Sequence, residues 1–236
     1  MKNGLILTTV LLVICTSAVS AQSSKKDTAS TPDLSGVWIG RPAGQASFSQ
    51  EQLPMKRRAE HDYKYNTVDA SNPVSPGRTQ LDPHIVNCAP PGVPRLWLTD
   101  RPFEIIQKPD EIVIFYEEDH NFRQVWMNLA EHPKDFGHSW VGHSSGKWDG
   151  DTLVIDTIGL RKEAWLDNAG HVNSDDLHLV ERIRRTDRNH LKIDITFFDP
   201  KAFTKSWTGQ RIVESVPNGE IKENVTCQDR IMREIP

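Results

Sequence analysis

The chain has 236 residues, with 28 basic and 32 acidic side chains and a formal net charge of −4 at pH 7. A chain of this length can bury one sizeable core, and it fits one domain. Because a mildly acidic protein gains nothing electrostatically from a polyanion, we expect no nucleic acid among its partners.

The first 21 residues have the pattern of a secretory signal peptide. Lys2 gives a charged start, an apolar run extends from Leu5 to Ala18, and Ala21 precedes the expected cleavage point. The apolar run is too short for a membrane span. Ile14 precedes Cys15 where a lipoprotein signal requires a small residue, so we expect no lipid anchor. The sequence therefore predicts a secreted protein, periplasmic or extracellular, without a membrane anchor.

Residues 22–32 are small and polar, and we expect a flexible lead-in there. We predict that residues 33–236 form a single β-barrel domain. From about Arg41 to Pro94 the chain is rich in prolines and poor in periodic runs, with one short helix expected near 49–62. Long irregular regions in compact domains are commonly lids or binding loops.

From Phe103 onward the apolar residues follow a period of two, which is typical of half-buried strands. Turn residues such as Asp149-Gly150 and Asn218-Gly219 favour tight hairpins. The four hairpins expected are 103–108 with 111–117, 144–148 with 151–157, 180–185 with 191–198, and 211–216 with 221–227. Because a meander of roughly eight to ten strands hides its edges by closing, we predict an all-β, antiparallel up-and-down barrel; a sandwich is the alternative.

Cys88 and Cys227 are the two cysteines that remain after cleavage. In an oxidising compartment such a pair is most often a structural disulfide. Neither has a CxxC neighbour, so a pair of reactive thiols is the less favoured alternative. We predict a Cys88–Cys227 bridge between an early loop and the last strand.

Gly36-Val37-Trp38, at the start of the first predicted strand, resembles the Gly-x-Trp of lipocalins and other calycin barrels. Nearly all of the mature chain is similar to a large family of secreted, mostly uncharacterised proteins of environmental bacteria. The segments that carry this resemblance are 88–95 (CAPPGVPR), 140–157 (WVGHSSGKWDGDTLVIDT), 174–182 and 199–200. The resemblance implies a lipocalin-like barrel but no particular activity.

The chain departs from that family in two places. Asn128-Leu129-Ala130 stands where relatives tend to have Asp-Gly-Arg. Asn173 stands where they tend to have a histidine directly before Ser174, and His171 is displaced from that position. No role is therefore assigned to these positions from the resemblance.

Glu181 is the strongest single indication of chemistry. Period-two alternation places it on the same strand face as Leu179 and Ile183, so its carboxylate is expected to face the interior. Burial raises a carboxyl pKa, as a general acid or base at neutral pH requires. The other interpretation is an internal ion pair with Arg123 or Arg182, because buried charges are commonly paired.

His143 follows a glycine and begins a predicted strand, which indicates a close backbone approach. It could pair with Glu181 or Asp156 in an acid–base site. His178 lies on the opposite strand face from Glu181, which argues against a simple dyad of those two. A hydrogen-bonded or surface role without chemistry stays open for each histidine.

The sequence predicts neither a metal nor a cofactor. His132, His138 and His143, with Asp135 nearby, match no ligand motif by their spacing. Residues 142–146 are not a nucleophile elbow in register, and phosphate-binding and dinucleotide glycine patterns are absent from the sequence.

Most of the seven tryptophans are expected in the core. Trp140 and Trp165 stand in loop-like sequence, and we expect them to contact a ligand together with Tyr116 and His178. The predicted ligand is a small, largely apolar molecule inside the barrel.

We predict an enzyme that performs acid–base chemistry (a lyase, isomerase or hydrolase) with Glu181, His143, Arg123, Arg182 and Asp156. A carboxylate on the inner face gives little advantage to a simple carrier, which favours the enzyme. The alternatives are a non-catalytic, lipocalin-like carrier and a structural envelope protein with a filled core.

Overall fold

The structure is a computed structural model that describes residues 31–66 and 82–223. The predicted signal peptide, nearly all of the predicted lead-in and Cys227 lie outside the described residues. The chain divides into two units, Met1–Ser30 and Thr31–Pro236, and the fold below is that of the second unit.

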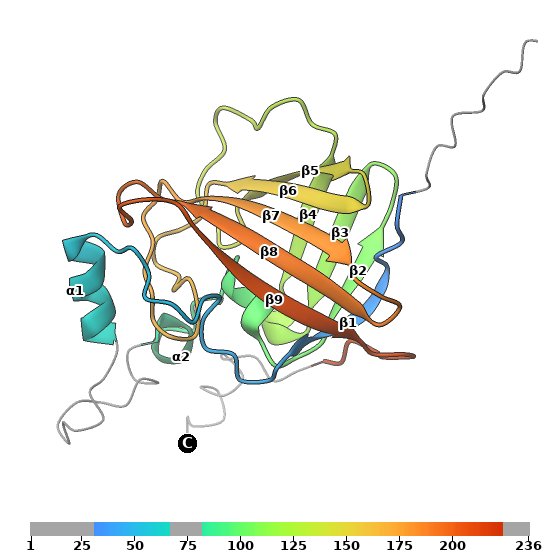
Figure 1. The fold of residues 1–236 in the computed structure, drawn as a ribbon, viewed down its shortest axis with the longest axis horizontal. Helices are drawn as coiled ribbons and strands as arrows, with labels where there is room; N and C mark the ends of the chain where they lie inside the picture. The colour runs from blue at the N-terminus through green and yellow to red at the C-terminus, as the bar shows by residue number, and fades with distance from the viewer. Residues whose placement is uncertain (1–30, 67–81, 224–236) are drawn as a thin grey trace, which may run out of the picture. The chain divides into compact units, whose positions relative to one another are not determined.

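Nine strands form one closed barrel in which each strand pairs with its neighbours in the sequence, and the first pairs with the last (Figure 1). The strands are β1 (Gly36–Arg41), β2 (Phe103–Gln107), β3 (Glu111–Tyr116), β4 (Phe122–Met127), β5 (His143–Asp149), β6 (Thr152–Ile158), β7 (His178–Arg185), β8 (His190–Phe198) and β9 (Trp207–Ser215). The predicted closed, mostly antiparallel β-barrel is therefore confirmed.

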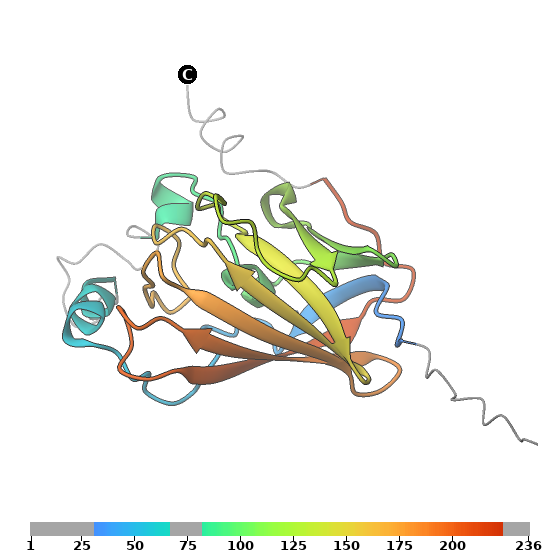
Figure 2. The ribbon, with the colours of Figure 1, turned by 90° about the horizontal axis from the view of Figure 1, so that it is seen from above.

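One pair of strands corrects the prediction of a purely antiparallel barrel. β4 and β5 are parallel, with Val125 opposite Ser144, whereas every other neighbouring pair is antiparallel. An odd number of strands in sequential order can close only if one pair is parallel. Residues 128–142 must therefore return along the length of the barrel, and they pass outside it (Figures 1 and 2).

The last predicted hairpin is also corrected. β9 begins at Trp207 and pairs with β8 and β1, so the strand starts before the predicted 211. The turn at Asn218-Gly219 is present, but residues 221–223 after it form no strand, and 224–227 lie outside the described residues. The expected helix near 49–62 is displaced, since α1 spans Arg57–Asn66.

The barrel interior contains a short helix that the sequence did not predict. All four residues of η2 (Arg95–Leu98) are buried, and the Trp97 ring packs edge-on against Phe103 and Tyr116 at centroid distances of 5.2 and 5.7 Å. Arg211 of β9 donates from Nε to the Trp97 carbonyl at 3.1 Å. Gly40 of β1 leaves room for that guanidinium, because a Cβ there would lie 2.0 Å from an Arg211 nitrogen. We call η2 the plug.

Candidate functional site

Glu181 and Arg123 form an ion pair in the barrel interior, at 0% and 1% exposure. The pair is bidentate: Arg123 Nη1 donates to Glu181 Oε1 at 2.9 Å, and Nη2 donates to Oε2. Trp97 of the plug donates from Nε1 to the same Oε1 at 2.6 Å. The carboxylate therefore holds the plug as well as the arginine.

Two hydroxyl groups complete this interior network. Arg123 donates from Nε to Ser144 Oγ at 3.0 Å and from Nη2 to Thr157 Oγ1 at 2.7 Å. Burial alone would lower the pKa of Arg123, but the adjacent Glu181 charge outweighs it, and the pKa rises. A buried charge pair whose donors and acceptors are satisfied is typical of a structural role. The geometry thus agrees with the ion-pair interpretation of Glu181 and Arg123.

A second charged network lies on the outer face of the barrel. His178 Nε2 and His132 Nε2 lie 2.9 Å from Asp156 Oδ2 and Oδ1, so one carboxylate holds two imidazoles. His132 Nδ1 lies 2.7 Å from His143 Nδ1. We call these four residues, in the order His178–Asp156–His132–His143, the relay.

Local structure explains how the relay is assembled. Asp156 on β6 and His178 on β7 project outward from neighbouring antiparallel strands, while the next residue on each strand, Thr157 or Leu179, faces inward. His132 belongs to the returning segment 128–142, which passes over this face. Because β4 and β5 are parallel, this segment has to return along the outside of the barrel before β5 begins. Its path brings His132 between Asp156 and His143.

The relay shifts two pKa values. Burial alone would raise the pKa of Asp156, but hydrogen bonds from His178 and His132 outweigh it and lower the pKa. Burial, aided by the charge of His132, lowers the pKa of His143. At neutral pH the relay therefore contains a carboxylate, and its His143 end favours the neutral imidazole.

A hollow of about 360 Å³ adjoins the relay on the outside of the barrel. Leu129, Val154 and Val180 contribute apolar surface to its wall. The polar part of the wall comes from Asp156, His132, Glu131, Ser145 and Lys147. His178 stands two residues before Val180 on the same outward face of β7, and its contact with Asp156 connects it to the wall of the hollow. Its ring stacks on Phe198 at 5.4 Å.

The other predicted site residues lie elsewhere. Arg182 is exposed and pairs with Asp149 at 2.8 Å, away from the Glu181 network. Tyr116 and Trp165 are buried, at 1% and 6% exposure. Trp140 is half-buried beneath the Arg161 guanidinium, 4.9 Å from the ring centroid. Of the four expected ligand contacts, His178 alone joins the relay.

The three histidines whose spacing matches no metal motif, His132, His138 and His143, do not form one group in the structure. His138 Nε2 lies 3.2 Å from the carbonyl oxygen of Asp175, whereas His132 and His143 belong to the relay. The sequence reasoning considered His132 only as a metal ligand and missed its contact with Asp156. Nothing in the local sequence signals that contact, because it depends on the path of residues 128–142.

Cys88 lies in the half-buried loop after α2 (Pro83–Val86), with a positive φ of 51°. Since Cys227 lies outside the described residues, the Cys88–Cys227 bridge stays a prediction. Within the described ranges, no helix combines the length and the hydropathy that crossing a membrane requires. Comparison with protein-family models gives no match, and comparison with curated proteins gives none either.

Proposed function

We propose that this protein is a secreted acid–base enzyme whose proton-transfer site is the relay on the outer face of the barrel. The observation that carries the proposal is the geometry of Asp156, which accepts a hydrogen bond from an imidazole on each of its two oxygens. This arrangement fixes both tautomers and stabilises an added positive charge on either ring. A carboxylate that only makes the outer face of a strand polar does not need two histidine partners.

The hydrogen bonds assign the proton positions. His178 donates from Nε2 to the Asp156 carboxylate, so Nδ1 carries a lone pair, and no described residue bonds to that atom. His132 likewise donates from Nε2, so its Nδ1 accepts the proton of His143 Nδ1. His178 Nδ1 is thus the atom that can act as the base. The imidazolium that forms when it takes up a proton is held against Asp156.

The hollow indicates the class of substrate. Leu129, Val154 and Val180 fit the apolar part of a small molecule, and Glu131, Ser145 and Lys147 can meet its polar groups. The volume of about 360 Å³ lies within the range of small-molecule sites. A proton removed from such a molecule passes to His178 Nδ1 and then to water. Lyase and isomerase reactions begin with this step, and a hydrolase would use the same base to activate water.

A carrier with its ligand inside the barrel is the weaker alternative. The plug and the Arg123–Glu181 pair occupy the interior, which weighs against a ligand there. The likeness to calycin barrels is part of the proposal. It is supported by Gly36-Val37-Trp38, which begins β1 as the Gly-x-Trp pattern requires.

The test uses a generic probe of enzymatic bases, the ring opening of 5-nitrobenzisoxazole. A base removes the carbon-bound proton, the N–O bond breaks, and a coloured cyanophenolate forms. We expect the mature protein to accelerate this reaction beyond an equal concentration of imidazole. His178→Gln and Asp156→Asn should each reduce the rate at least tenfold, because the first removes the base and the second removes the charge that orients it.

His190→Gln is the matched control. His190 pairs with Asp187 at the same 2.9 Å, but it lies at the exposed β7–β8 turn, away from the hollow. The rate should be unchanged in this variant. Equal rates in the wild-type protein and in His178→Gln would refute the proposal.

A further inference from the structure

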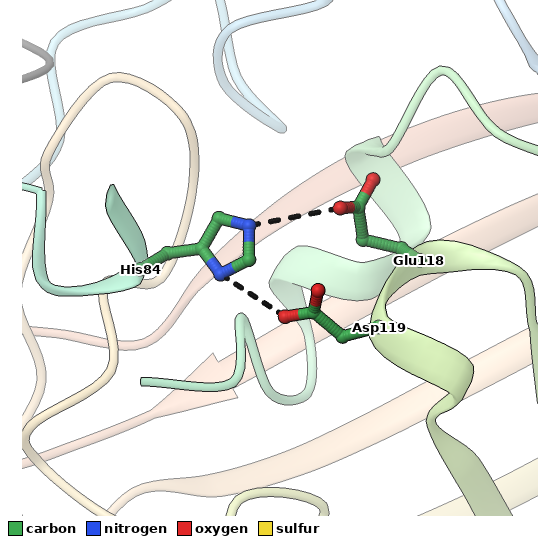
Figure 3. A group of neighbouring side chains, drawn as sticks. All are labelled: His84, Glu118 and Asp119. Carbon is green, nitrogen blue, oxygen red and sulfur yellow. Dashed lines mark ion pairs between the residues drawn. The ribbon is translucent and has the colours of Figure 1, made fainter. Parts of the chain in front are cut away.

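We propose that His84, Glu118 and Asp119 form a binding site for one divalent transition-metal cation, separate from the relay. His84 belongs to α2, and the two carboxylates are consecutive residues of η3 (Glu118–His120), the turn between β3 and β4. Figure 3 shows the imidazole facing both carboxylates. The proposal departs from the sequence analysis, which predicted no metal.

The spacing of the ligand atoms fits a coordination sphere. One ligand atom from each residue lies within 4.8 Å of the others. His84 Nε2 lies 3.6 Å from Glu118 Oε1, and His84 Nδ1 lies 3.3 Å from Asp119 Oδ2. Two ligands that each lie about 2.1 Å from a tetrahedral zinc are about 3.4 Å apart. The Glu118 oxygen and the imidazole are therefore close to the separation that a shared cation requires.

A backbone carbonyl selects the nitrogen that can bind the metal. His84 Nδ1 lies 3.0 Å from the carbonyl oxygen of Ala89, which can only accept a hydrogen bond. Nδ1 therefore carries the proton, and the lone pair of the neutral ring is on Nε2, the atom that faces Glu118. Histidines that bind metals commonly donate their other ring N–H to a carbonyl or carboxylate in this way. Asp119 also has an oxygen within 4.8 Å of the other two ligand atoms, close enough to share the cation.

The electrostatics of the site attract a cation. The hydrogen bond to Glu118 is the largest cause that raises the pKa of His84, and it outweighs the opposing effect of burial. Arg101 Nε lies 3.4 Å from Glu118 Oε2, so this guanidinium contacts the oxygen that faces away from His84. A bound metal and a proton would compete for the same lone pair of His84.

The site also has room for further ligands. His84 and Glu118 line a hollow of about 360 Å³ whose wall includes Arg95, Arg101 and Asn168. Three protein ligands beside an open space leave coordination positions for water or a small anion, an arrangement typical of reactive rather than structural metal sites. One imidazole and two carboxylates suit Zn²⁺ or Mn²⁺ better than Ca²⁺, which favours oxygen ligands alone.

The experiment is a titration of the mature, metal-free protein with Zn²⁺ at pH 7.5, by calorimetry and by native mass spectrometry. We expect one Zn²⁺ per chain. Glu118→Gln and His84→Gln should each weaken binding at least tenfold, while the relay variant His178→Gln binds Zn²⁺ as the wild-type protein does. Circular dichroism spectra that match the wild type exclude loss of fold as the cause.

Three results would overturn the proposal: no stoichiometric binding, undiminished binding in His84→Gln, or loss of binding in His178→Gln. The last result would place the metal at the relay. Mn²⁺ gives a second measurement that does not depend on the variants, because its paramagnetism broadens nearby NMR signals. The amides of His84 and Asp119 should broaden first, and broadening centred on Asp156 would contradict the assignment.

Discussion

Two charged networks share strands β6 and β7 and lie on opposite sides of the barrel wall. Thr157 faces inward to the Arg123–Glu181 pair, and its neighbour Asp156 faces outward to the relay. Glu181 is fully buried, whereas the Asp156 side chain is 41% exposed. Carboxylates on adjacent strands therefore have different surroundings, because one side of the wall excludes water and the other borders a hollow.

A buried carboxylate in a barrel is therefore not by itself a sign of catalysis. Inside, the two oxygens of Glu181 are bound by Arg123, Trp97 and Thr157, and no substrate can reach them. Outside, the two oxygens of Asp156 hold the imidazoles of His132 and His178, and the His178 side chain is 38% exposed. The following predictions test this division, starting with the largest expected effect.

Glu181→Gln should lower the free energy of unfolding by about 3–5 kcal/mol, because it leaves the Arg123 charge buried without a counter-charge. Urea denaturation at pH 7 measures the change. Arg182→Gln is the control: it removes the exposed pair with Asp149 from the next position on β7, and about 0–1 kcal/mol is expected. Equal losses in the two variants would show that the interior pair is not structural.

Replacing both partners should restore much of that loss. In the double variant Arg123→Met and Glu181→Leu no buried charge is left, and apolar replacements of buried pairs are often neutral or stabilising. We expect the double variant to be about 2 kcal/mol more stable than Glu181→Gln in the same denaturation experiment. If the double variant is less stable than the single one, hydrogen bonds to Trp97 and Thr157 matter more than the charges do.

The adjacent residues of β6 should respond differently. Thr157→Val deletes the hydroxyl that bonds Arg123 and Ser144, and a loss of about 1–3 kcal/mol is expected from the unsatisfied buried partners. Asp156→Asn changes a half-exposed group, and a loss below about 1 kcal/mol is expected. Thermal unfolding of both variants shows which of them loses more stability. The reverse order would contradict the separation of stability from chemistry at the barrel wall.

The smallest effects are two pH dependences of opposite sign, measured in metal-free protein. The pKa of His84 is raised in the fold, so its contribution to stability is complete below the unfolded value of about 6.5 and is lost as the pH rises through the folded value. The pKa of His143 is lowered, so its contribution is complete above about 6.5 and is lost as the pH falls. Denaturation midpoints are measured from pH 5 to 9. In His84→Gln the decrease of the midpoint toward high pH should disappear, and in His143→Gln the decrease toward low pH should disappear.

Most of the barrel follows from the sequence, because alternation and turn residues are local signals. The hairpins at Pro109-Asp110 and Asp149-Gly150 lie where the pattern predicts them. The plug could not be predicted in the same way. Residues 95–98 form a single turn between proline-rich loops, and only the tertiary structure places Trp97 against Glu181.

The candidate site was predicted only in part. The inward direction of Glu181 and the outward direction of His178 follow from the period of two, and the structure has both. The contact between His132 and Asp156 could not be predicted in this way. His132 reaches Asp156 only because residues 128–142 return along the outside of the barrel. The path of this segment depends on the number of strands in the barrel and on the direction of β5 relative to β4. Neither can be read from the sequence around His132 or Asp156.

Closure of the barrel also has a consequence for folding. The pairing of β1 with β9 joins the two ends of the strand order, for example Trp38 with Ser215, whereas the hairpin pairs are close in sequence. Contacts between residues so far apart in the sequence form late and slowly, because the chain between them must first be organised. Until this seam closes, β1 and β9 each expose an unpaired edge to other chains. The most aggregation-prone stage of folding therefore lasts until the last strand is in place.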